Sequence, residues 1–138
     1  MDFLDRVKEY LETELSLPYP IIVGVLGAES PSIAIRQTPS AVIDRYVDRG
    51  KTFEFSFQVL MKDKGRKQVN VIDTMSRIFD LLDGLPSGSI TSNDGSFNFV
   101  TCECSTLPNF VEKTEHNEYI YTSIYTAELE KRRSINGF

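Results

Sequence analysis

The stretch Tyr46–Asp63, which reads YVDRGKTFEFSFQVLMKD, decides the fold of this chain. Within it, apolar residues occupy every second position from Phe53 to Met61, and mostly polar residues lie between them. A period of two is typical of a long strand with one buried face and one exposed face. Arg49-Gly50-Lys51 is a turn signal, and the alternating run Val42–Asp48 precedes it. The sequence therefore predicts a long central hairpin.

Two segments have the three- and four-residue spacing of an amphipathic helix. The first, Asp2–Leu15, carries acidic residues in its first turn, where the helix dipole favours them, and ends before Pro18. The second, Gln68–Leu85, ends at Gly84 and Pro86. The apolar stripe predicted for it consists of Val69, Ile72, Met75, Ile78 or Phe79, and Leu82. Both helices are expected to turn their stripes toward the core.

Further alternating runs predict strands at Ser32–Gln37, Phe97–Ser105 and Glu118–Glu130, whereas Ile21–Leu26 fits either a short strand or a buried loop. Segments 86–96 and 106–117 are predicted to be loops, because they are polar and rich in turn residues. Strands cluster along the chain instead of alternating with helices. The sequence therefore predicts an α+β fold, with a mostly antiparallel sheet of about five to six strands and two helices packed on one face. The length of 138 residues suits a single domain, residues 1–138.

Charge and composition narrow the class of protein. The net charge of -5 at pH 7 disfavours sequence-independent binding to DNA. No apolar run approaches the roughly 20 residues that span a bilayer, and the N-terminus lacks the pattern of a signal peptide. We therefore expect a protein without a membrane partner that is made in the cytoplasm. The two cysteines, Cys102 and Cys104, are expected to be reduced, because their spacing on a strand does not suit a disulfide bridge.

The sequence contains no recognisable catalytic motif. Phosphate-binding and dinucleotide-binding glycine loops are absent, as is a nucleophile elbow. We therefore expect no enzyme activity, no catalytic residues, no cofactor and no metal site. One alternative stays open: Asp44 and Asp48 share a strand face and, with the single histidine His116, could serve a small metal-dependent hydrolase. The basic segment Lys62–Lys67 is interpreted as a solvated hairpin end, with phosphate contact as the alternative.

Nearly the whole chain resembles the small minor capsid proteins of long-tailed phages and prophages of Gram-positive bacteria, which are similar to tail-terminator proteins. The resemblance lies in the order of the expected helices and strands and in the residue pattern of each. Besides the two helices, the matching segments are Ser32-Ile33-Ala34-Ile35-Arg36 with Pro39, Tyr46-Val47-Asp48-Arg49-Gly50, Phe53–Val59 and Glu118–Leu129. The resemblance implies an α+β structural protein of the virion.

The same resemblance implies a ring of subunits, a hexamer, that caps the tail tube and joins it to the head connector. The implied partners are further copies of this chain, the major tail-tube protein and the head–tail connector protein, with DNA passing through the lumen without specific binding. The isolated subunit could also stay monomeric until a tube end templates the ring. The implied location is the host cytoplasm during assembly and then the head–tail junction of the virion. A head-side connector or neck protein is an alternative that the sequence does not separate from this one.

Candidate interface residues of such a ring are polar or aromatic positions on strands. An alternating strand without a clean apolar face suits a sheet edge, and tyrosines on strands favour either core packing or an interface. The candidates are Arg36, Asp44, Arg45, Tyr46, Asp48, Tyr121 and Tyr125. For each of them, a position in solvent or in the core is the alternative.

Overall fold

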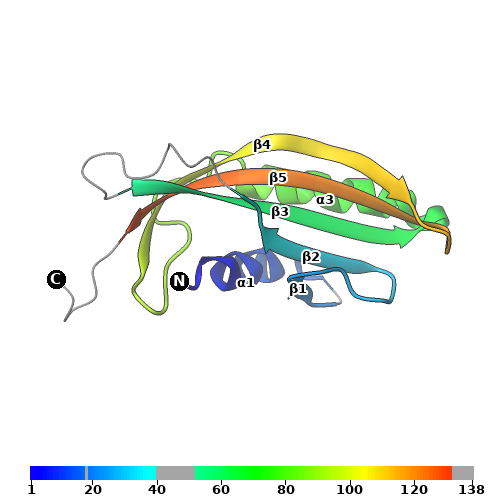
Figure 1. Ribbon diagram of the computed structural model, residues 1–138, viewed down its shortest axis with the longest axis horizontal. Helices are drawn as coiled ribbons and strands as arrows, with labels where there is room; N and C mark the ends of the chain where they lie inside the picture. The colour runs from blue at the N-terminus through cyan, green and yellow to red at the C-terminus, as the bar shows by residue number, and fades with distance from the viewer. Residues whose placement is uncertain (18, 40–51, 132–138) are drawn as a thin grey trace.

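The computed structural model describes residues 1–17, 19–39 and 52–131 (Figure 1). Its elements are α1 (Phe3–Leu15), β1 (Ile21–Val23), β2 (Ser32–Gln37), β3 (Thr52–Lys64), the 3-10 turn η2 (Gly65–Lys67), α3 (Gln68–Leu82), β4 (Phe97–Lys113) and β5 (Glu118–Lys131). The strands form one five-stranded sheet of order β1-β2-β3-β5-β4. β1 runs parallel to β2, and the other neighbours are antiparallel. The predicted α+β fold with a mostly antiparallel sheet is confirmed.

Strand β3 lies at the centre of the sheet. All 13 of its residues pair with β5, and Phe57–Lys62 also pair with β2. Its successive positions from Phe55 to Met61 alternate between buried and half-buried, with the buried side chains on one face. The predicted hairpin partner Val42–Asp48, with the turn that follows it, lies outside the described residues. Among the described strands, the neighbours of β3 are β2 and β5.

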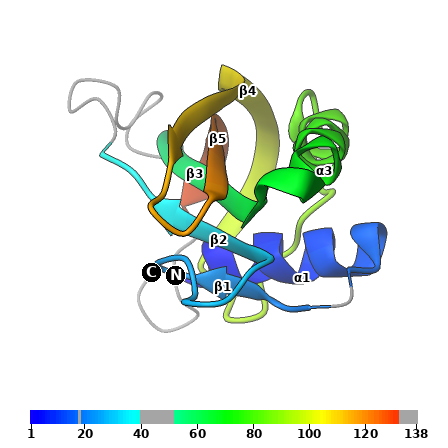
Figure 2. The same cartoon turned by 90° about the vertical axis from the view of Figure 1, so that its right-hand side faces the viewer.

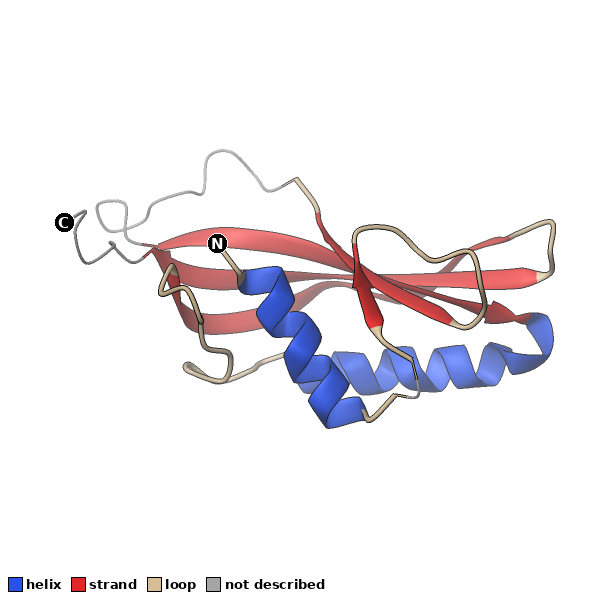
Figure 3. Ribbon diagram, turned by 90° about the horizontal axis from the view of Figure 1, so that it is seen from below, coloured by secondary structure: helices blue, strands red, loops and turns tan. Residues whose placement is uncertain are grey.

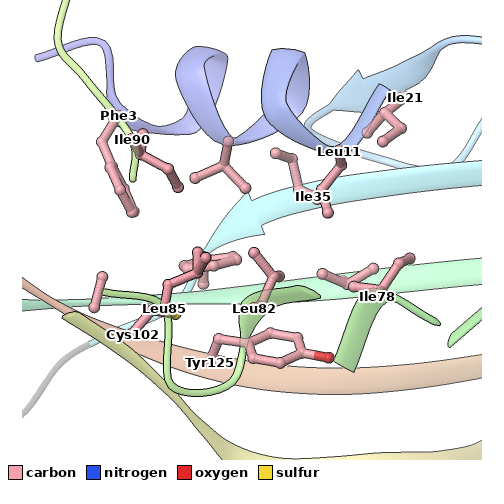
Figure 4. Packing of buried hydrophobic residues seen from close by; sticks show 14 of the residues in the cluster. Phe3, Leu11, Ile21, Ile35, Ile78, Leu82, Leu85, Ile90, Cys102 and Tyr125 are labelled. Carbon is pink, nitrogen blue, oxygen red and sulfur yellow. The ribbon is translucent and has the colours of Figure 1, made fainter. Parts of the chain in front are cut away.

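Both helices pack on the same face of the sheet (Figures 2 and 3). Phe3 of α1 lies among four phenylalanine rings of β3 and β4, with centroid distances of 5.1 to 6.3 Å. Ile78 and Leu82 of α3 belong to the same buried cluster as Tyr125 of β5 (Figure 4). Buried apolar residues from both helices and all five strands form one cluster. Within the described residues, the opposite face of the sheet carries no helix.

The buried stripe of α3 differs from the predicted one. Val69 and Ile72 are 76% and 46% exposed, whereas Val71 and Thr74 are buried together with the predicted Met75, Ile78 and Leu82. The helix contains enough apolar residues for two overlapping stripes. Steps of four, three and four residues from Val71 keep the side chains within one narrow arc, which packs on the sheet. The helix also ends at Leu82, before Leu85, which forms a bridge with β4.

Strand β4 is longer than predicted, because residues 106–113 continue the strand where the sequence indicated a loop. Its pairing with β5 shifts register at four places, and this half contains Pro108. The residues from Ser105 onward are exposed or half-buried on both faces. Burial therefore imposes no alternation there, and an edge strand tolerates proline and bulges. A polar, irregular sequence is compatible with a strand in this position.

Asp2 joins the beginning of the chain to the loop that precedes β4. Its carboxylate accepts hydrogen bonds from the backbone N–H groups of Asn93 (2.7 Å) and Asp94 (3.2 Å) and from the hydroxyl of Ser92 (2.8 Å). These contacts span about ninety positions of sequence, so they hold a distant loop against the first turn of α1.

Replacing Asp2 by alanine is expected to lower the free energy of unfolding by about 1–2 kcal/mol, because two backbone donors lose their acceptor. Urea titration followed by circular dichroism measures this loss. Asp5→Ala is the matched control, since Asp5 is exposed in the same first turn. Equal losses in the two variants would contradict the contact and indicate an effect of the helix dipole alone.

Candidate interaction surfaces

Arg36 is exposed on β2, as a candidate contact residue must be. Its Nε donates a hydrogen bond to Oε1 of Gln58 on the neighbouring strand, at 2.8 Å. Both residues lie on the face of the sheet that no described helix covers, which we call the outer face. Four other candidates, namely Asp44, Arg45, Tyr46 and Asp48, lie outside the described residues.

Tyr121 and Tyr125 lie in the core of the subunit, where they are not available to a partner. Tyr125 is 0% exposed, and its ring stacks on Phe57 with a centroid distance of 5.6 Å. The hydroxyl of Ser123 donates a hydrogen bond to its phenol oxygen at 3.0 Å, and burial raises the pKa of this phenol. Tyr121 is 9% exposed, and its phenol oxygen accepts a 2.6 Å hydrogen bond from Gln68 of α3. Both rings point to the helical face, so they pack the subunit together.

His116 lies exposed in the turn between β4 and β5, where its backbone N–H donates to the hydroxyl of Thr114 at 3.3 Å. Asp44 and Asp48, its companions in the metal-site hypothesis, are not among the described residues. In residues 1–17, 19–39 and 52–131, no three His, Cys, Asp or Glu side chains are grouped so that they could hold a metal ion. In the same part of the chain, no helix has the length and apolar character needed to cross a membrane.

Both cysteines on β4 are free thiols. Cys102 is 1% exposed, and burial raises the pKa of its thiol to about 12. Burial also raises the pKa of the half-buried Cys104 thiol. A thiol that stays protonated is a poor nucleophile and a poor metal ligand, so Cys102 acts as a core residue.

A buried ion pair joins the end of β3 to the beginning of β5. Nζ of Lys62 lies 3.5 Å from Oε2 of Glu118, and the two side chains are only 10% and 7% exposed. The hydroxyl of Ser30 donates a hydrogen bond to the same carboxylate, and Lys62 donates one to the Ala28 carbonyl at 3.4 Å. The Ser30 hydrogen bond, and after it the charge of Lys62, hold the pKa of Glu118 below its ordinary value of 4.5. The sequence offered no signal for this network, because its members are polar residues far apart in the chain.

Apart from Lys62, the cations of the basic segment Lys62–Lys67 line a pocket. Lys64, Arg66 and Lys67 border a space of about 520 Å³ between α3, the end of β3 and the segments around Tyr19 and Pro31. We name these three cations and the space they line the basic pocket. Among the described residues, none of the three cations forms an ion pair. The helix α3 begins here without a side-chain cap and without an acidic residue in its first turn, which adds positive potential.

An acidic cluster lies toward the other end of β3, on the outer face of the sheet. Glu54 and Glu128 are direct cross-strand partners, and Glu103 on β4 pairs with Thr126 beside them. All three glutamates are exposed, and no ion pair within the described residues neutralises them. Like charges that face one another across a ladder repel. We call Glu54, Glu103 and Glu128 the acidic cluster.

The part of β4 from Ser105 to Lys113, which we call the outer half of β4, is a third surface suited to contact. Leu107, Phe110 and Val111 are 64%, 48% and 46% exposed, although they are large apolar residues. This half of the strand pairs only with β5 among the described strands, so its other edge is open. Exposed apolar side chains beside an open edge are typical of a site for protein contact.

Comparison with known proteins identifies a family and similar folds among solved structures. Residues 10–131 match the family described as bacteriophage tail terminator protein. A chain from the virion of a native gene transfer agent particle has a similar fold, with a TM-score of 0.63 and 11% sequence identity over 91% of this chain and 92% of that one. A second solved structure has a TM-score of 0.53 and 12% identity over 96% of this chain and 92% of the other. A search of the curated proteins found no match.

The family match extends from the middle of α1 to the end of β5, which is most of the chain. At 11% and 12% identity, the solved structures show a shared fold and no more. The chain belongs to the bacteriophage tail terminator family and is a structural protein of a phage tail.

Proposed function

We propose that this chain is the subunit of a ring that caps the tail tube and joins it to the head connector. The observation that carries the proposal is the family match over residues 10–131, which includes every strand of the sheet. The similarity in fold to a chain of a gene transfer agent virion supports a role inside a particle. The subunit also has unlike surfaces on different sides. Unlike surfaces suit head-to-tail contacts, which close into a ring when the rotation between copies allows it.

The proposed ring is a hexamer that forms in the host cytoplasm and remains at the head–tail junction of the virion. Its partners are the tail-tube protein and the connector protein, and DNA passes through its lumen without specific binding. The subunit is proposed to have no enzyme activity. Arg36, which lies on the outer face of the sheet, is proposed as an interface residue. Further interface residues are proposed from the sequence alone, namely Asp44, Arg45, Tyr46 and Asp48.

The purified chain is expected to form a ring, or to stay monomeric and assemble only on tube ends. Light scattering coupled to size-exclusion chromatography, over a range of concentrations and with or without tail tubes from the same phage, distinguishes these outcomes. Electron microscopy of the mixtures shows whether tube ends are capped. A fixed monomer or dimer that ignores tube ends would overturn the proposal and favour a head-side connector.

Within the same experiment, Arg36→Ala is expected to weaken capping without changing the circular dichroism spectrum. Arg77→Ala is the matched control, because Arg77 is exposed on α3, away from the outer face of the sheet. Normal capping by Arg36→Ala would remove Arg36 from the interface and leave the ring proposal in place.

A further inference from the structure

The basic pocket and the acidic cluster cannot neutralise one another within one subunit. Lys64 is the last residue of β3, and Glu54 is its third. Ten residues of extended strand separate them by about 33 Å, at about 3.3 Å per residue. Among the described residues, neither group therefore meets a partner of opposite charge.

The basic pocket has the chemistry of a site for carboxylates. It offers the ammonium groups of Lys64 and Lys67 and the guanidinium of Arg66, which can bind a carboxylate through two parallel hydrogen bonds. Two acidic residues also line it. Asp63 is 8% exposed and accepts a hydrogen bond from the backbone N–H of Lys64 at 2.7 Å, whereas Asp73 is exposed on α3. The three cations outnumber these two carboxylates.

The surroundings of the pocket favour a protein partner over nucleic acid. Val69 and Ile72 follow the basic turn on the first turns of α3, and they are 76% and 46% exposed. Exposed apolar residues beside charged ones are typical of protein contacts, whereas nucleic-acid surfaces are dominated by cations. The net charge of -5 also repels a phosphate backbone over longer distances.

We propose that neighbouring subunits of the ring join head to tail, with the basic pocket of one copy receiving the acidic cluster of the next. This inference rests on the proposed ring and identifies an interface within it. Complementary charge supports a second copy as the partner, because each copy carries one cationic and one anionic group that have no ion-pair partners among the described residues. Each copy uses both groups once, and the contact relieves the repulsion between Glu54 and Glu128. Such a contact is heterologous, which is the type that generates rings.

Two charge-reversal variants and their mixture test the proposal. The pocket variant is Arg66→Glu/Lys67→Glu, and the cluster variant is Glu54→Lys/Glu128→Lys. Each variant alone brings like charges together at every interface, so its assembly on tube ends is expected to weaken about tenfold or more. An equal mixture is expected to assemble again as an alternating ring, since each reversed surface then meets a complementary one. A chain that carries both reversals is expected to assemble for the same reason.

Matched controls carry the same change in charge elsewhere on the surface. They are Arg77→Glu/Lys113→Glu for the pocket variant and Asp80→Lys/Glu115→Lys for the cluster variant, all at exposed positions outside the two groups. Both controls are expected to assemble like the natural chain. Circular dichroism and melting temperature identify any variant that has lost its fold, and rescue in the mixture requires that both components are folded.

The outcomes separate this inference from the ring proposal. If the natural chain assembles and both reversal variants assemble equally well, the inference fails and the ring stands. If the natural chain never assembles, even on tube ends, the ring itself fails. The inference is also overturned if the natural chain shifts a short DNA duplex in a gel and the pocket variant loses this binding while still capping tubes, because the pocket would then bind phosphate.

Discussion

Replacing Phe3 by alanine is expected to lower the free energy of unfolding by about 3–5 kcal/mol, the range for a large aromatic side chain removed from a packed core. Phe3 is 0% exposed and lies in edge-to-face or stacked contact with Phe55, Phe57, Phe97 and Phe99. These rings come from the beginning of β3 and the beginning of β4. The variant therefore leaves a cavity at the place where α1 holds two strands together.

Urea unfolding, followed by circular dichroism, measures this loss. Phe110→Ala is the matched control, because the chemical change is the same but the ring of Phe110 is 48% exposed. Phe110 contacts only Tyr119 and Tyr121 among the described aromatic rings, so its loss is expected to cost about 1 kcal/mol. If Phe3→Ala cost no more than the control, the first helix would not be part of the cooperative core.

Replacing Glu118 by alanine is expected to cost about 3 kcal/mol, because Lys62 is left as a buried charge without its partner. The two side chains are 7% and 10% exposed, so water cannot easily replace the lost carboxylate. The hydroxyl of Ser30 loses its acceptor at the same time. Glu115→Ala removes an exposed carboxylate from the neighbouring turn and is expected to change stability little. Equal losses in the two variants would show that the ion pair does not stabilise the fold.

The same ion pair predicts how stability depends on pH. The pKa of Glu118 is lower in the folded chain than its ordinary value of 4.5, because Ser30 and Lys62 favour the charged carboxylate. Its contribution is therefore fully present above pH 4.5 and is lost as the pH falls through the lowered folded pKa. The difference in unfolding free energy between the natural chain and Glu118→Ala should shrink over that acidic range. A difference that stays constant with pH would contradict this coupling.

Local patterns in the sequence predict the elements whose burial is one-sided and regular. α1 keeps helical spacing at Phe3, Val7, Leu11 and Leu15, and all four are buried. β3 and β5 alternate because one face of each meets the helices and the other does not. In these elements, the period of the apolar residues follows directly from which face loses water.

The same patterns do not reveal what covers a buried face. They also do not reveal where a strand continues although neither of its faces is buried. The alternation around Tyr125 would be the same whether α3 or a second subunit covered it, and the structure places it in the core of the subunit. Val69 and Ile72 fit a helical stripe as well as Val71 does, and only packing on the sheet selects between them. The outer half of β4 has no alternation to detect, because neither of its faces is buried.

The sequence by itself determined the α+β class, the two helices and the long alternating strand β3. Those features depend on residues close together in the chain. Only the tertiary structure decided that β3 lies between β2 and β5, that Lys62 is buried against Glu118, and that the basic segment lines one pocket with Tyr19 and Pro31. These features join segments that lie tens of residues apart. Their energies arise from burial and charge pairing between such segments. The spacing of residues within a single segment therefore does not predict these contacts.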